Sequence, residues 1–247
     1  MKTQQTPRPR SLSRLALLLA MIMSLSPLSD VSAHGKEDQL GAWYMYFWSW
    51  ATEGGQDRGR LGLQGDIRYR NWDLGGDLEQ LLLRGGLTYQ PAQLNTKLTL
   101  GYAHITSGEF GEADDTVTEH RIYQEALVPQ QLGSRLYLTH RYRYEQRFTD
   151  NPTTRTRFRY ALFMNIALNQ ASLKQGALYL ALYNEIFVNG ERALADGSSV
   201  TFFDRNRAYA AIGYSLTDRI RAQFGYMQQT TGDVNKGQAQ LSLHQAW

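Results

Sequence analysis

The sequence predicts an all-β protein that closes into a transmembrane β-barrel, and the segment 135–148 is the main reason. Its charged residues, such as Arg141 and Arg143, alternate with aromatic residues, such as Tyr142 and Tyr144. A period of two over fourteen residues indicates a β-strand, whereas globular strands usually run about 5–6 residues. A long strand that is charged on one face and apolar on the other suits a wall between lipid and a polar lumen.

Two further observations support this fold class. Similar alternating runs continue along most of the chain, separated by short segments rich in Gly, Pro, Asn and Asp. After the N-terminal region there is no run of 18 apolar residues, so the sequence predicts no transmembrane helix.

Residues 1–33 are predicted to be a cleaved signal peptide. A basic start (Lys2, Arg8, Arg10 and Arg14) precedes a short apolar stretch and then the small residues of Val31-Ser-Ala33. The mature barrel is therefore expected to span 34–247, with export to the bacterial outer membrane of a Gram-negative cell.

Composition limits what the mature chain could do. Residues 1–33 hold four of the 26 basic and one of the 23 acidic residues, which leaves 22 of each. The mature chain is thus near neutral, and its charge gives no support for nucleic-acid binding. There is no cysteine, which excludes disulfides, thiolate metal sites and cysteine nucleophiles.

Eleven segments have the alternation or the aromatic and apolar density of a strand. In chain order they are 40–51, 60–70, 77–89, 96–106, 118–127, 135–148, 155–169, 177–189, 204–216, 219–229 and 237–247. Bacterial single-chain barrels usually have an even number of strands. We therefore expect about twelve strands, with ten as the alternative.

Several blocks of the sequence resemble one known family. These blocks are 119–124, 141–148, 157–160, 183–187 and 203–207, together with Gly213-Tyr214 and Gly225-Tyr226. They resemble the outer-membrane barrel family catalogued as domain of unknown function 2490, over most of the mature chain. The resemblance implies a Gram-negative outer-membrane barrel, and it implies neither a substrate nor catalytic residues.

The polar phase of the strands predicts a lumen lined with arginine and glutamate. The residues expected in this charge network are Glu119, Arg121, Glu125, Arg135, Arg141, Arg143, Glu145, Arg147, Arg157, Arg159, Glu185, Arg205 and Arg207. A turn within 128–133 would place Glu119 opposite Arg141 and Glu125 opposite Arg135, with Glu145 opposite Arg157 or Arg159. Such a network could be structural, or its surplus arginines could attract an anion.

The function expected from these features is a narrow channel or a barrel that binds a small anionic solute. One alternative is an outer-membrane enzyme that acts on phospholipid or lipopolysaccharide, and another is a purely structural barrel with a sealed lumen. The sequence favours no enzyme: His120 and His140 fall on the outward face without a serine or carboxylate beside them, and Ser242 with His244 lacks a third member. No catalytic, cofactor or metal residue is predicted.

The expected partners follow from the location. Outer-membrane lipid and lipopolysaccharide would surround the wall. The last strand ends at Trp247 after alternate apolar residues, which resembles the signal that the barrel-assembly machinery reads.

Overall fold

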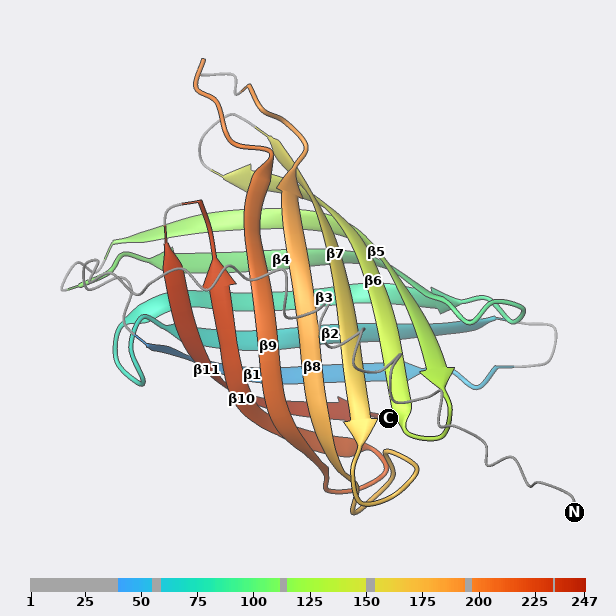
Figure 1. Cartoon of the computed structure of the whole chain (residues 1–247). Coiled ribbons are helices and arrows are strands. Elements are labelled where there is room, and N and C mark those ends of the chain that lie inside the picture. Colours follow the sequence, from blue (N-terminus) through green and yellow to red (C-terminus); the bar gives the residue numbers. More distant parts are fainter. Residues whose placement is uncertain (1–39, 55–58, 112–114, 150–153, 194–196, 233) are drawn as a thin grey trace, which may run out of the picture. The chain divides into compact units, whose positions relative to one another are not determined.

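The computed structural model describes residues 40–54, 59–111, 115–149, 154–193, 197–232 and 234–247. These residues form eleven strands in one closed barrel, which confirms the predicted all-β fold (Figure 1). The strands are β1 Gly41–Ala51, β2 Arg60–Asn71, β3 Leu78–Gln90, β4 Lys97–Gly108, β5 Thr116–Leu132, β6 Leu136–Thr149, β7 Arg155–Ala167, β8 Leu178–Asn189, β9 Phe203–Ser215, β10 Ile220–Thr230 and β11 Asn235–Ala246. The predicted signal peptide lies outside the described residues. No described residue belongs to a helix with the length and apolar character needed to cross a membrane.

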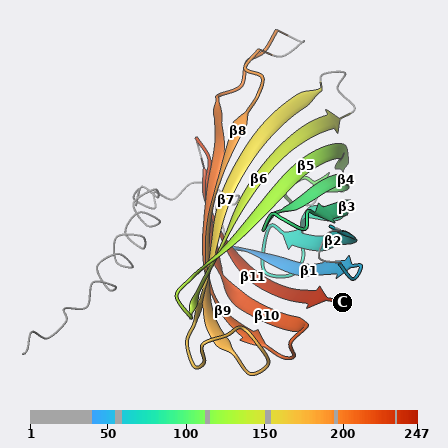
Figure 2. The same ribbon diagram turned by 90° about the vertical axis from the view of Figure 1, so that its right-hand side faces the viewer.

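The barrel closes through a parallel pair. Each strand from β1 to β11 is antiparallel to the next, whereas β1 and β11 run in the same direction, with Tyr44 opposite Leu241 (Figure 2). An even number of strands is required only when the first and last strands pair antiparallel. The parallel closure therefore permits eleven strands in the described residues, one fewer than the expected twelve.

Strand β5 differs most from its prediction, because it continues through Pro129 to Leu132. Strand β4 begins at Lys97, opposite Leu127, so the β5–β6 hairpin has a neighbour on only one side beyond that point. A proline is tolerated there because a sheet edge does not need its missing N–H. The turn is Gly133–Arg135, where Gly133 has φ of +62°, a conformation that favours glycine.

This longer strand changes the register of β5 against β6. Glu119 lies opposite Thr149 and Glu125 lies opposite Arg143, so the predicted pairs with Arg141 and Arg135 are wrong. The prediction placed the centre of the turn four residues too early. The next hairpin agrees with its prediction, since Glu145 lies opposite Arg157.

The connections divide between two rims of the barrel. One end, which we call the C-terminal rim, holds Trp247 and the described connecting residues 52–54, 59, 91–96, 133–135, 168–177 and 216–219. The other end, the loop rim, holds the described connecting residues 72–77, 109–111, 115, 154, 190–193, 197–202, 231–232 and 234. In the 72–77 turn, the N–H groups of Gly76 and Gly75 donate to Asp73 and hold the pKa of its carboxyl below the usual range.

The two faces of the wall have inverted polarity compared with a soluble barrel. Outward side chains such as Leu63, Leu100 and Phe224 are exposed, whereas inward charges such as Arg143 and Glu185 are buried. Soluble monomers rarely expose apolar patches larger than a few hundred Å². The apolar exterior continues around strands β2 to β11, and the charged interior provides the candidate site.

Candidate functional site

The charged side chains reach the lumen because alternate residues of each strand point inward. On β6 the inward positions are Arg141, Arg143, Glu145 and Arg147, while the aromatic residues between them point outward. The same alternation on β5, β7 and β8 brings further charges to the same wall. The charges of neighbouring strands therefore lie side by side and form rows along the inner wall of the barrel.

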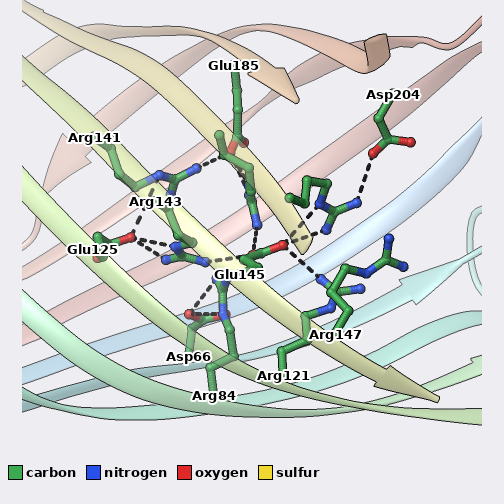
Figure 3. Close-up of polar contacts among 12 residues, drawn as sticks. Asp66, Arg84, Arg121, Glu125, Arg141, Arg143, Glu145, Arg147, Glu185 and Asp204 are labelled. Atoms are coloured by element: carbon green, nitrogen blue, oxygen red, sulfur yellow. Dashed lines mark hydrogen bonds and ion pairs between the residues drawn. The ribbon is translucent and has the colours of Figure 1, made fainter. Parts of the chain in front are cut away.

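Six of these residues form a closed ring of ion pairs on the β5–β8 wall (Figure 3). In order around the ring they are Glu145, Arg159, Glu185, Arg141, Glu125 and Arg143. Arg159 donates Nη1 to Glu145 at 2.5 Å and lies 2.6 Å from Glu185 through Nη2. Arg141 donates to Glu185 at 2.5 Å, and Arg143 donates Nε to Glu125 at 2.8 Å. The ring is completed by longer ion pairs of 3.9 Å, Arg141 to Glu125, and 3.7 Å, Arg143 to Glu145.

Glu145 is the centre of this network. It pairs with Arg157 at 2.7 Å and with Arg159 at 2.5 Å, and Arg121 and Arg143 each lie 3.7 Å away. Only 1% of its surface is exposed. Four guanidinium groups surround this one buried carboxylate and fix its position.

Two smaller groups extend the network toward the loop rim. Glu119 pairs with Arg121 at 2.7 Å and with Arg147 at 2.5 Å. Asp204 pairs with Arg157 at 2.9 Å and with Arg205 at 3.2 Å. Since Arg121 and Arg157 also contact Glu145, these groups are continuous with the ring.

A separate group lies on β2 and β3. Asp66 pairs with Arg68 at 2.7 Å and with Arg84 at 2.8 Å. From the same strand Gln64 donates to Glu125 at 3.0 Å, which joins this wall to the ring. The sequence showed the necessary signal, because 60–70 has the same alternation, but the predicted network omitted Asp66, Arg68 and Arg84.

The lumen contains a cavity of about 430 Å³, which lies between this network and the C-terminal rim. Its lining begins at rim residues such as Leu127 and Ala246 and ends at ring residues such as Glu125 and Arg143. The network side chains beyond it, including Glu119 and Arg157, do not line the cavity. Their burial indicates that side chains fill the middle of the barrel.

The lining of the cavity is strongly cationic. It includes eight basic side chains and three acidic ones, and each acidic side chain is already paired with arginine. The basic side chains that have no carboxylate within 4 Å, among the described residues, are Lys97, Arg207, Arg219 and Arg221. The cavity therefore has a local excess of positive charge, although the mature chain as a whole is near neutral.

Three residues of the predicted network occupy different surroundings. Arg135 lies in the β5–β6 turn, where Nη1 donates to the backbone carbonyls of Ala167, Leu168 and Gln170 at 2.9–3.2 Å. Arg205 is partly exposed beside Asp204. Arg207 is buried but makes no ion pair within the described residues; instead its Nε donates to Gln229 at 2.9 Å.

The histidines also have defined contacts. Outward-facing His120 lies opposite Phe148, not opposite His140 as the predicted register implied, and it contacts Tyr102 at 2.5 Å. His140 contacts Tyr160 at 2.9 Å. In the described residues, no group of three His, Cys, Asp or Glu side chains is placed to hold a metal ion.

Ser242 and His244 face the cavity from β11. The Ser242 hydroxyl and His244 Nε2 are 3.0 Å apart, and the imidazole stacks on Phe47 with ring centroids 4.5 Å apart. No carboxylate contacts His244 within the described residues, so the pair lacks the group that would orient a catalytic base.

Comparison with known proteins gives one match. Residues 40–240 match a family model described as "Protein of unknown function (DUF2490)". No curated protein and no solved structure matches the chain.

Proposed function

The chain belongs to the DUF2490 family of proteins of unknown function, and we propose that it is an outer-membrane barrel that binds a small anionic solute in its lumen. The observation that carries this proposal is the cationic cavity at the C-terminal rim, with eight basic and three acidic side chains. A cavity of this volume is within the range of small-ligand sites.

The inverted polarity of the wall supports the membrane location. Leucine, isoleucine, phenylalanine and tyrosine residues cover the outer face, for example Leu100, Phe224 and Tyr142. An apolar outer band around a polar interior is typical of outer-membrane barrels. Together with the predicted signal peptide, this pattern favours the outer membrane of a Gram-negative bacterium.

The ion-pair network favours solute binding over free conduction. Its side chains occupy the lumen beyond the cavity, and moving one of them would separate a buried charge from its partner. Breaking a buried ion pair by removing one partner costs about 3–5 kcal/mol. We therefore expect a solute to enter from the C-terminal rim and to stop at the network.

Arg221 offers a direct test of the cationic cavity. It has no carboxylate partner in the described residues, so its replacement leaves no buried charge unpaired. In barrel purified from membranes, Arg221→Gln is expected to weaken the binding of a small organic anion severalfold, as measured by calorimetry, because one nearby positive charge is lost. Arg192→Gln removes the same charge from an exposed position outside the cavity and should leave binding unchanged.

Two results would contradict the proposal. One is that no anion binds, or that anions and cations bind equally. The other is discrete conductance in a planar bilayer with anion preference, which would favour an anion-selective channel.

The contact between Ser242 and His244 supports a second candidate, a hydrolase acting on an ester that enters the cavity. Hydrolysis of phospholipid by the purified barrel, lost in Ser242→Ala, would favour it. The lack of an orienting carboxylate makes this the weaker candidate.

A further inference from the structure

The cavity contains buried donors that make no hydrogen bond within the described residues, and the Tyr209 hydroxyl is one of them. Arg141 Nε and Arg143 Nη1 also make none, but they face Glu125 at 3.9 Å and Glu145 at 3.7 Å in the ring. Each of them can donate a hydrogen bond. Unpaired buried donors are costly, and a ligand with acceptor oxygens would satisfy them.

The Tyr209 hydroxyl belongs to the same strand face as the uncompensated Arg207. Arg207 and Tyr209 occupy successive inward positions on β9, and both line the cavity. Tyr209 is 6% exposed.

The guanidinium of Arg207 is positioned to bind an anion. Its Nε is held by Gln229, and its guanidinium lies over the Phe187 ring, 4.8 Å from the centroid. Its two Nη groups make no hydrogen bond within the described residues. Glu185, its cross-strand neighbour, is paired with Arg141 and Arg159. A planar carboxylate can be bound by two parallel N–H groups of such a guanidinium.

Resting on the proposed function, we propose that Arg207 and Tyr209 form the subsite for the acidic group of the solute, and that this group is a carboxylate on an apolar or aromatic body. The planar guanidinium of Arg207 matches a planar carboxylate, and the neutral Tyr209 hydroxyl can donate to one of its oxygens. Aromatic side chains, including Tyr183, Tyr179 and Phe163, line the same cavity and suit an apolar body.

The test measures binding of three probes to the purified barrel by calorimetry: benzoate, its neutral isostere benzamide, and inorganic phosphate. Benzoate is expected to bind at least tenfold more tightly than either of the others. Tyr209→Phe should weaken benzoate binding about tenfold, because a hydrogen bond to a charged group is lost.

A matched control separates this effect from the loss of any tyrosine hydroxyl. Tyr214 lies on the same strand but points outward, so Tyr214→Phe should bind benzoate as the unmodified barrel does. Heat-modifiable gel mobility shows whether each variant is folded, and the phenylalanine variants preserve the ring and its packing.

The outcomes distinguish this inference from the proposed function. If benzoate binds equally to the unmodified barrel and to Tyr209→Phe, the subsite is wrong while an anion-binding lumen stands. If phosphate binds and benzoate does not, the carboxylate assignment is wrong. If neither anion binds more tightly than benzamide, the anion-binding function itself fails.

Discussion

At the scale of single residues, the lumen depends on the shape of arginine. Arg141, Arg143 and Arg159 each contact two carboxylates, and they do so through different nitrogens of one guanidinium. A lysine ammonium is a compact point charge on a flexible stem and lacks this planar fork. The strands can therefore hold a ring of alternating charges with little freedom for the side chains to rearrange.

Glu145 should be the most sensitive position of the network. Glu145→Gln removes one of the two close carboxylate partners of Arg157 and of Arg159 in a buried site, and leaves them Asp204 and Glu185 respectively. The expected loss is about 3–5 kcal/mol in the free energy of unfolding, measured by urea titration in detergent micelles. Glu109→Gln, at an exposed position of the 109–115 connection, should change stability little. Equal free energies of unfolding for the two variants would show that the contacts of Glu145 contribute nothing to stability.

At the scale of strands, the period-two pattern predicted most of the fold. Predicted and observed strand ends agree within two residues, except at the end of β5. That error arose because Pro129 was taken as a turn residue, and it also shifted the predicted register of β5 against β6.

The contact between Asp66 and Arg84 shows a different limit of the sequence. Both residues lie on predicted strands, but their contact depends on how β2 pairs with β3. The Arg135 side chain is held by backbone carbonyls at the end of β7 and in the β7–β8 connection. The sequence around Arg135 contains no pattern that indicates this contact.

Contacts between strands also limit side-chain size. The ring of Tyr179 on β8 lies over Gly213 on β9, where an added methyl group would overlap it. Gly213→Ala is therefore expected to destabilise the barrel by about 1–3 kcal/mol, the usual cost of overpacking. Gly75→Ala, in a turn with open space around the glycine, is the control. Unfolding midpoints of the two variants in the same detergent would test this, and similar midpoints would show that Tyr179 moves aside at little cost.

At the scale of the whole barrel, the closure of eleven strands determines which strands face each other across the cavity. Five strand steps separate β11 from β6 in one direction and six in the other, so these strands lie on opposite walls. Gln240 and Arg143 therefore face the cavity from opposite sides, which allows one solute to be contacted from both. The parallel β1–β11 pair is the step in closure that a strand-by-strand interpretation of the sequence missed.

This closure predicts a specific cross-link. Outward-facing Tyr44 and Leu241 lie opposite each other, whereas Leu243 lies opposite Tyr46. Because the natural chain has no cysteine, oxidation of Tyr44→Cys with Leu241→Cys should give one intramolecular disulfide in the folded barrel. Tyr44→Cys with Leu243→Cys should give much less, since that pair is offset by two residues along parallel strands. Gel mobility with and without a reductant measures both variants. Preferential cross-linking of the offset pair would mean a different β1–β11 register, and absence of both cross-links would mean that other strands close the barrel.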